Sequence, residues 1–327
     1  MTDHALVESP LQFITAVEAL ADSPDAVIHW RANARGMSGF MDAYRPEWLP
    51  AGVRTRPGLP EKDLPAGGRL LLGDVCSGRI QKLLADGYVT RLLPQVVVLD
   101  DGLATVTVMR QLMLSSQPIQ RPRSPVSALR LPLSAFVSSR LRGLARKGRL
   151  TWCTSLLTDP GLREQLETAG LRVQTHRFEH TRALRAAEAP TTPAIVIGSA
   201  MAADGLIDPD AYRGWVNSAA QAGPVTYYPH RREDPQFLQD LRQDPRIRVE
   251  ESGLPLELRL SALAPGTRIH SLPSTAALSL ALMHPEAHVA ITGVPAACWL
   301  PAAPQAFRAD AQAVADDLDR MGLASTC

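Results

Sequence analysis

Three short groups of residues in this chain have the side chains that a group-transfer reaction needs. An acidic pair, Asp100 and Asp101, follows the apolar residues 96–99. His230 follows a second apolar run, and Ser274 with Thr275 precedes a helical pattern. A carboxylate can remove a proton from a hydroxyl, and an imidazole with hydroxyls near a helix start can stabilise a phosphate leaving group. These residue types therefore favour attack by a hydroxyl on a phosphate-activated group.

The elements that must position these residues follow from the hydrophobic pattern. Short apolar runs alternate with helical periodicity along the chain, which favours parallel sheets with helices on their faces. In open sheets of this kind, ligands bind beyond the carboxyl ends of strands, where all three groups lie. Strands are predicted over residues 5–8, 26–30, 69–74, 95–99, 149–153, 194–198, 224–228, 247–249, 268–270 and 288–291. Helices are predicted from residue 10 onward and over residues 162–169, 210–221, 235–241, 256–263, 275–283 and 304–321.

The alternating series occurs twice. Residues 187–193 contain Pro190 and Pro193 and are predicted to be a linker. The sequence thus predicts an N-terminal domain over residues 1–186 and a C-terminal domain over residues 194–327, two doubly wound α/β domains facing a central cleft. No internal sequence repeat relates the two halves.

The composition is that of an ordinary globular protein. The chain has 327 residues, 45% of them hydrophobic and 20% charged, and a formal net charge of +1. This charge gives no indication of a nucleic-acid partner. There is no pattern of a signal peptide or a bilayer-spanning segment, so we expect a cytoplasmic protein. The four cysteines are scattered, which favours free thiols and predicts no metal site.

One segment is strongly basic. No acidic residue occurs between Asp101 and Asp159, whereas arginines are frequent over residues 110–149. A solvated surface explains this pattern. The alternatives are a face for an anionic acceptor glycan and, because apolar residues between 131 and 144 allow an amphipathic helix, a peripheral contact with an anionic membrane.

Each group of candidate residues also has a purely structural interpretation. The acidic pair is a common turn with capping aspartates, His230 packs at a strand end, and Ser274 caps a helix. Asp208-Pro209-Asp210 favours a helix cap over a metal site. Gly198 and Ser199 would allow a nucleotide to approach the backbone closely. The sequence lacks a Walker-type phosphate loop, a GxGxxG after a strand, HExxH and GxSxG.

Taken together, the groups resemble the motifs of bacterial sialyltransferases of glycosyltransferase family 52 and the related polysialyltransferase-like proteins. Those proteins have an acidic (D/E)(D/E)G motif, a histidine motif of HP type and a late Ser-Ser or Ser-Thr motif, in that order. The similar segments here are Asp100-Asp101-Gly102, Pro229-His230 and Ser274-Thr275, and residues 8–12 resemble the first strand-to-helix turn. The resemblance extends from residue 5 to about residue 292. One departure is that His230 is followed by Arg231, with proline before the histidine.

The resemblance implies a GT-B fold of two Rossmann-like domains, with the acceptor bound mainly by the first and the nucleotide by the second. It implies an inverting glycosyltransferase that moves sialic acid or a related nonulosonic acid from a CMP-activated donor to a glycan or glycolipid hydroxyl. No metal or other cofactor is implied. Such activity would belong to bacterial capsule or lipopolysaccharide biosynthesis, at the inner face of the cell membrane.

The resemblance also implies residue roles. Asp101 is the expected general base, with Asp100 as the competing choice, and His230 would contact the phosphate and act as the leaving-group acid. Glu257 would bind the ribose hydroxyls, with Glu251 as its competitor. The nucleotide-binding set is Gly198, Ser199, Pro229, His230, Glu257, Ser271, Ser274 and Thr275. The set at the acceptor or the first turn is Ser9, Gln12 and Arg35.

Two other functions stay open at this point. One is a GT-B transferase that uses another nucleotide-sugar, such as a UDP-hexose. The other is a non-catalytic glycan-binding or glycan-assembly protein on the same fold. The sequence identifies neither the acceptor nor the linkage.

Overall fold

In the computed structural model, the chain divides into two compact units, Met1–Leu184 (unit 1) and Arg185–Cys327 (unit 2). The division lies two residues before the predicted end of the first domain at residue 186. Residues 187, 188 and 191 of the predicted linker lie outside the described residues. The structure describes residues 1–60, 68–86, 95–102, 104–115, 117–122, 128–157, 159–185, 189–190, 192–251 and 253–320.

The described part of unit 1 contains a parallel sheet of seven strands in the order β3-β2-β1-β4-β5-β6-β7. The strands are β1 (Asp3–Val7), β2 (Ala26–Trp30), β3 (Val53–Pro57), β4 (Arg69–Leu72), β5 (Gln95–Val98), β6 (Leu150–Thr154) and β7 (Arg172–Thr175). The strand order reverses between β1 and β4. Crevices for ligands form at such a switch point, beyond the carboxyl ends of the strands.

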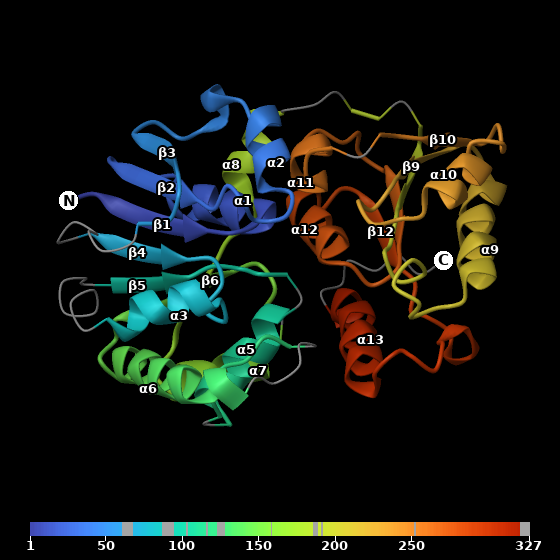
Figure 1. The fold of residues 1–327 in the computed structure, drawn as a ribbon. Helices are drawn as coiled ribbons and strands as arrows, with labels where there is room; N and C mark the ends of the chain where they lie inside the picture. Colours follow the sequence, from blue (N-terminus) through green and yellow to red (C-terminus); the bar gives the residue numbers. More distant parts are fainter. Residues whose placement is uncertain are drawn as a thin grey trace. The chain divides into compact units, whose positions relative to one another are not determined.

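Helices cover both faces of this sheet (Figure 1). α1 and α8 contact each other on one face, and α3, α5, α6 and α7 form a connected layer on the other. The helices of unit 1 are α1 (Pro10–Ala19), α2 (Met37–Ala43), α3 (Gly78–Ala85), α5 (Ala104–Met113), α6 (Leu131–Arg146), α7 (Pro160–Thr168) and α8 (Glu179–Leu184), with 3-10 turns η1 (Pro46–Trp48) and η2 (Ala128–Arg130).

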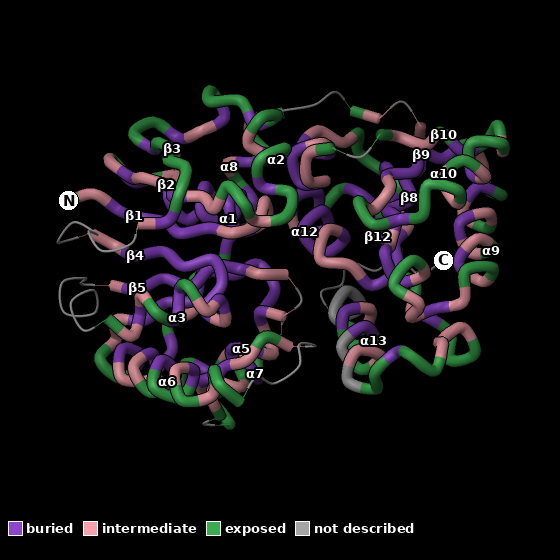
Figure 2. Tube along the Cα trace, in the orientation of Figure 1, coloured by how far each residue is buried: buried purple, intermediate pink, exposed green. Residues whose placement is uncertain are grey.

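The continuous apolar runs of the central strands reflect burial on both faces (Figure 2). Leu70 and Val96 belong to the core under α6, together with Val137. Their chain neighbours Leu71 and Val97 point to the opposite face and are equally buried. This explains why β4 and β5 are visible in the sequence as unbroken hydrophobic stretches.

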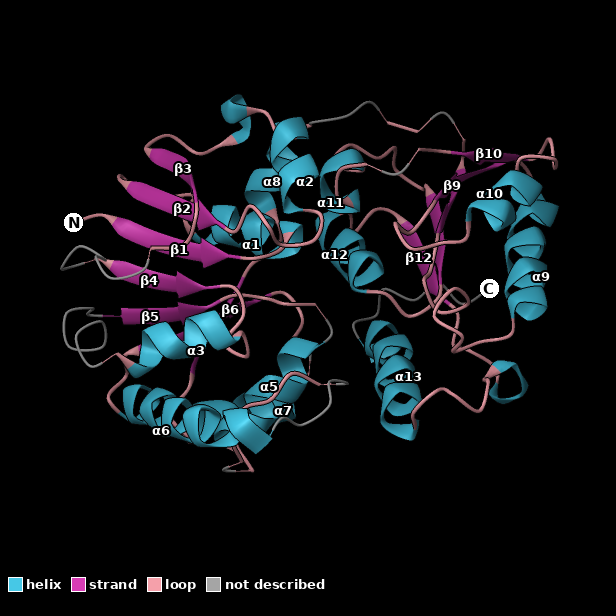
Figure 3. Ribbon diagram, viewed as in Figure 1, coloured by secondary structure: helices cyan, strands magenta, loops and turns pink. Residues whose placement is uncertain are grey.

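The described part of unit 2 contains a five-stranded parallel sheet in the order β10-β9-β8-β11-β12, again flanked by helices (Figure 3). The strand order reverses between β8 and β11. The strands are β8 (Ala194–Ile197), β9 (Val225–Tyr228), β10 (Ile247–Val249), β11 (Arg268–Ser271) and β12 (His288–Ile291). The helices are α9 (Pro209–Ala219), α10 (Pro235–Leu241), α11 (Leu256–Arg259), α12 (Thr275–Met283) and α13 (Gln305–Arg320), with 3-10 turns η3 (Ala220–Ala222) and η4 (Ala296–Cys298).

The predicted α/β class, with two doubly wound Rossmann-like units, is confirmed. The prediction missed the edge strands β3 and β7, which lack an apolar run because most of their side chains are at least partly exposed. α11 ends at Arg259, four residues earlier than predicted. There the Ser261 hydroxyl donates to the Leu258 carbonyl at 2.9 Å, a local hydrogen bond that competes with helix continuation.

The basic segment forms the predicted amphipathic helix in part, as α6. Its apolar residues Val137 and Leu141 are buried in the core of unit 1, so this face is not available to a membrane. Leu129 and Phe136 are exposed, at 95% and 48%. Peripheral membrane contact stays a prediction. Among the helices that the structure describes, none is both long and apolar enough to cross a bilayer.

Candidate functional site

The acidic motif of unit 1 is fixed by the first strand-to-helix turn. Ser9 caps α1 and accepts a hydrogen bond from the Gln12 N–H at 3.3 Å, while Pro10 occupies the first helical position. The Gln12 side chain extends to the end of β5, where its Nε2 donates to Asp101 Oδ1 at 2.6 Å. Its Oε1 accepts the Glu8 N–H at 2.7 Å, which fixes the orientation of the amide. Ser9, Gln12 and Asp101 therefore form one connected group.

Gly73, at the end of β4, makes room for this connection. A Cβ at residue 73 would overlap the Oε1 and Cδ atoms of Gln12. Any larger residue would displace the amide that bridges β1 and β5. Gly73 is thus a positioning residue that the motifs did not identify.

Asp101 is a partly exposed carboxyl group with a shifted acidity. Burial and the neighbouring carboxylate of Asp74 raise the pKa of Asp101 from 3.8 to about 6, although the hydrogen bond from Gln12 opposes the shift. Asp74 itself accepts hydrogen bonds from Arg121 and, at 2.7 Å, from the Cys76 N–H. A carboxyl group that titrates near neutral pH is well matched to general-base catalysis.

Asp100 has a different environment. Only 1% of it is exposed, and its Oδ2 accepts hydrogen bonds from the N–H and the hydroxyl of Ser155 at 2.7 and 3.1 Å. His176 Nε2 lies 3.6 Å from the same oxygen. Asp100 thus ties β5 to the ends of β6 and β7. The carboxylate that raises the Asp101 pKa is that of Asp74, which lies two residues beyond the end of β4.

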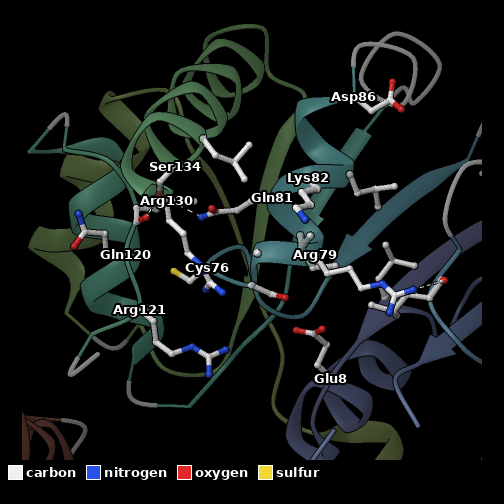
Figure 4. Close-up of a pocket in the computed structure, with 18 of the residues that line it drawn as sticks. Glu8, Cys76, Arg79, Gln81, Lys82, Asp86, Gln120, Arg121, Arg130 and Ser134 are labelled. Atoms are coloured by element: carbon white, nitrogen blue, oxygen red, sulfur yellow. Dashed lines mark hydrogen bonds between the residues drawn. The ribbon is translucent and has the colours of Figure 1, made fainter. Parts of the chain in front are cut away.

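A large pocket opens beside this group, at the switch point between β1 and β4 (Figure 4). Its volume is about 1030 Å³, and Glu8, Arg31 and Arg121 line it. A small cavity of about 20 Å³ adjoins it and is lined by Asp101, with Cys76 and Arg121 common to both. Arg31 pairs with Glu8 at 3.0 Å. Arg35 lies exposed in the loop after β2 and does not line the pocket.

In unit 2, His230 lies in a tight turn after β9. Its N–H donates to Glu233 Oε2 at 2.7 Å. Its Nδ1 accepts the Arg232 N–H at 3.2 Å, so the neutral ring has its proton on Nε2. The turn thus makes Nε2 a hydrogen-bond donor. Pro229 restrains the chain immediately before the turn.

A buried network below this turn holds it in place. Glu233 Oε1 accepts hydrogen bonds from the Tyr212 hydroxyl at 2.8 Å and from the Tyr227 hydroxyl. The Ser199 N–H donates to the Tyr212 hydroxyl at 2.8 Å. Burial raises the pKa of Glu233 and of both tyrosines. The network joins the carboxyl ends of β8 and β9.

Gly198 lets the two strand ends approach. A Cβ there would lie 2.5 Å from Glu233 Oε2 and 2.8 Å from the His230 nitrogen. The sequence indicated a close backbone approach at this glycine. In the structure the approaching group is the His230 turn of the same chain.

The third group lies beyond β11. Ser274 is the N-cap residue of α12, but its side chain makes no capping hydrogen bond, contrary to the capping interpretation of the sequence. The first N–H groups of α12, where Thr275 begins the helix, thus lack that side-chain partner. Ser271 is buried, and its hydroxyl donates to the Leu272 carbonyl at 2.6 Å. Ser199 and Ser274 follow β8 and β11, the two strands at the switch point of unit 2.

The two ribose candidates differ in burial. Glu257 lies in the first turn of α11, is 4% exposed and has its pKa raised by burial. The Glu251 carboxylate is exposed and lies 3.4 Å from Arg242. The ribose role of Glu257 stays a prediction. Asp208 caps α9 by accepting the Ala211 N–H at 2.8 Å, so the expected helix cap at the Asp-Pro-Asp segment is confirmed.

Several residues of these sites were missed by the sequence analysis. Asp74 ends a predicted strand in a Gly-Asp pair, and Glu233 lies three residues after His230, so both had weak local signals. Arg121 belongs to the basic segment that the sequence analysis singled out, but nothing in the sequence paired it with Asp74. Tyr212 had no local signal, because its neighbours in the structure are distant in sequence. Among the residues that the structure describes, no cluster of three or more His, Cys, Asp or Glu could hold a metal ion.

No protein-family model matches the chain, and no curated protein matches it in sequence. Eight chains of known structure match its fold. One is from the crystal structure of a UDP-glucose:anthocyanidin 3-O-glucosyltransferase in complex with UDP. It is 10% identical, with 97% of this chain and 94% of that chain covered, at a TM-score of 0.43. A likeness at this level does not bear on the activity.

Proposed function

We propose that this chain is an inverting glycosyltransferase that moves a sugar from a nucleotide-activated donor to a glycan hydroxyl. The observation behind the proposal is Asp101, a carboxyl group with a pKa of about 6 that follows β5, one strand away from the switch point of unit 1. It is anchored by Gln12 and lies next to a pocket of about 1030 Å³. The order of the three motifs supports the same activity.

Asp101 is the general base in this proposal. Because Gln12 occupies Oδ1, the other oxygen, Oδ2, takes the proton of the acceptor hydroxyl as that hydroxyl attacks the anomeric carbon. The raised pKa makes the carboxylate a stronger base than an ordinary aspartate while leaving it ionised above about pH 6. Attack opposite to the leaving group inverts the configuration at the anomeric carbon.

Unit 2 stabilises the leaving group. As the glycosidic bond breaks, negative charge develops on the departing phosphate. His230 donates from Nε2, while Ser274, Thr275 and the first N–H groups of α12 bind the phosphate oxygens. Donors held in place before the reaction stabilise this charge without reorganisation.

For the donor, we propose a CMP-activated sialic acid or related nonulosonic acid. The motif resemblance supports this choice. One imidazole and one helix N-terminus, which follow β9 and β11 of the same sheet, would suit the single phosphate of CMP. A UDP-sugar, with two phosphates, is the competing donor.

Nucleotide binding tests this proposal. We expect CMP to raise the melting temperature, since a ligand at about 100 times its Kd adds roughly 2.7 kcal/mol of stability. Ser274→Ala should weaken CMP binding. Ser218→Ala is the control, because the Ser218 hydroxyl only donates to the Trp215 carbonyl on α9. A larger shift with UDP would move the donor to the UDP class. No shift with either, and no nucleotide release from a panel of CMP- and UDP-sugars, would reject the transferase.

A further inference from the structure

The pocket of unit 1 is strongly cationic. Its walls come from the ends of β1 and β2, from α3 and from the segment leading into α6, and Figure 4 shows Arg121, Arg130 and Lys82 extending toward it from different elements. Two carboxylates, Glu8 and Asp86, also line it. The cations that line it are Arg31, Arg79, Lys82, Arg121 and Arg130.

The cations differ in how far they are neutralised. Arg31 pairs with Glu8 at 3.0 Å, and Arg121 pairs with Asp74. Lys82 and Arg130, by contrast, have no hydrogen-bond or ion-pair partner among the residues that the structure describes. Within the described part of the chain, two of the positive charges that line the pocket therefore have no ion-pair partner.

The start of α3 adds to this positive field. Ser77 is its N-cap residue, and the Ser77 side chain makes no capping hydrogen bond. Arg130 packs against the first residue of the helix, with its guanidinium carbon 3.6 Å from the position that a Cβ on Gly78 would occupy. Helix N–H groups, a hydroxyl and a guanidinium thus meet at one wall, a combination that binds carboxylate and phosphate groups.

We propose that the acceptor is an anionic glycan whose carboxylate or phosphate binds between the start of α3 and Arg130, with Lys82 close by. This inference rests on the proposed function, because it assigns the acceptor of the same site. The shared lining residues Cys76 and Arg121 place this wall next to the cavity of Asp101. A volume of about 1030 Å³ exceeds the upper end of small-ligand pockets and accommodates the end of an oligosaccharide.

Glycan binding without a donor tests the inference separately from the transferase activity. Isothermal titration would compare sialyllactose with its methyl ester, lactose 6′-phosphate with lactose, and trigalacturonate with its methyl ester. We expect at least one acidic glycan to bind at least about 10-fold more tightly than its neutral counterpart, less so at high salt. The carboxylate and phosphate arms identify the acidic group.

Variants locate the binding site. Arg130→Gln should weaken acidic-glycan binding by about 10-fold or more, and Arg130→Lys, which keeps the charge but not the planar fork, by less. Arg146→Gln, at the other end of α6 and outside the pocket lining, is the charge-matched control and should leave the Kd unchanged. Melting curves check that each variant is folded.

The inference is overturned if neutral and acidic glycans bind with the same Kd or if no acidic glycan binds. It is also overturned if Arg130→Gln and Arg146→Gln have the same Kd for acidic glycans. Binding only to vesicles with 30% phosphatidylglycerol would also overturn it, in favour of a membrane surface. None of these outcomes depends on CMP binding by unit 2, so failure of the acceptor assignment is distinguishable from failure of the transferase.

Discussion

The two units each contain a carboxyl group with a raised pKa, and the two groups differ in their hydrogen bonds and their exposure. Burial raises the pKa of both Asp101 in unit 1 and Glu233 in unit 2. Asp101 accepts a hydrogen bond from one side chain, Gln12, and remains partly exposed beside a pocket. Glu233 accepts hydrogen bonds from two tyrosines and from the His230 N–H and is turned inward. A buried carboxyl group with a single hydrogen-bond donor keeps an oxygen available for proton transfer. One whose oxygens accept several hydrogen bonds instead holds neighbouring segments together, and we call Glu233 with its three donors the clamp of unit 2.

The largest expected effect follows from replacing the carboxylate of unit 1. Asp101→Asn should lower transfer by about 10²–10⁴-fold while CMP still binds, because the base acts on the acceptor. Transfer rates and CMP titration measure this. Asp100→Asn is the comparison, and we expect it mainly to lower the melting temperature by weakening the tie to Ser155. Normal turnover in Asp101→Asn would show that Asp101 is not the general base.

The next largest effect concerns the imidazole of His230, whose turn is held by Glu233. His230→Ala should lower turnover by about 10²–10³-fold, more than it weakens CMP binding, because the donor acts mostly on charge that develops in the transition state. Donor turnover per folded molecule measures this. If the folded fraction retains full activity, His230 only packs at the end of β9.

Gly198→Ala tests the clamp itself. The new Cβ would press on Glu233 and on the His230 nitrogen, so we expect a loss of about 1–3 kcal/mol of unfolding free energy, measured in urea, with lower activity. Gly214→Ala is the matched control, since a Cβ there meets nothing within 4 Å and the residue lies inside α9. It should be neutral or stabilising by up to about 1 kcal/mol. Equal stability of the two variants would contradict the close packing at Gly198.

The smallest effect is a shift in a pH profile. The base works when ionised, so kcat/KM should rise with pH and reach half its limit near pH 6, the pKa of Asp101. The Gln12 hydrogen bond favours the ionised carboxylate. Gln12→Ala should therefore move the rise of kcat/KM to higher pH. A purely structural role for Gln12 would lower activity equally at every pH.

The raised pKa of Asp101 also makes the free energy of unfolding depend on pH. Because the folded value of about 6 lies above the ordinary 3.8, the protonated group favours the folded state. This contribution is complete below about pH 4 and is lost as the pH rises through about 6. Asp101→Asn should therefore be at least as stable as the wild type at pH 8.

Local sequence patterns determined the α/β class and most of the elements. Central strands such as β5 and β9 are short apolar runs, and their ends coincide with Asp101 and His230 because polar residues stop a buried strand. The motifs therefore indicated which strand ends to examine. The edge strands of unit 1, β3 and β7, escaped prediction because solvent exposure removes the hydrophobic signal that central strands show.

The sequence by itself determined which residues have reactive side chains and that they lie at strand ends. Only the tertiary structure decided that Asp101 rather than Asp100 adjoins the pocket, that Asp74 tunes it, and that Arg130 meets the start of α3. Strand order and loop packing bring together residues far apart in the chain. Acidity and charge depend on such neighbours through space, whereas a sequence pattern reports only neighbours along the chain.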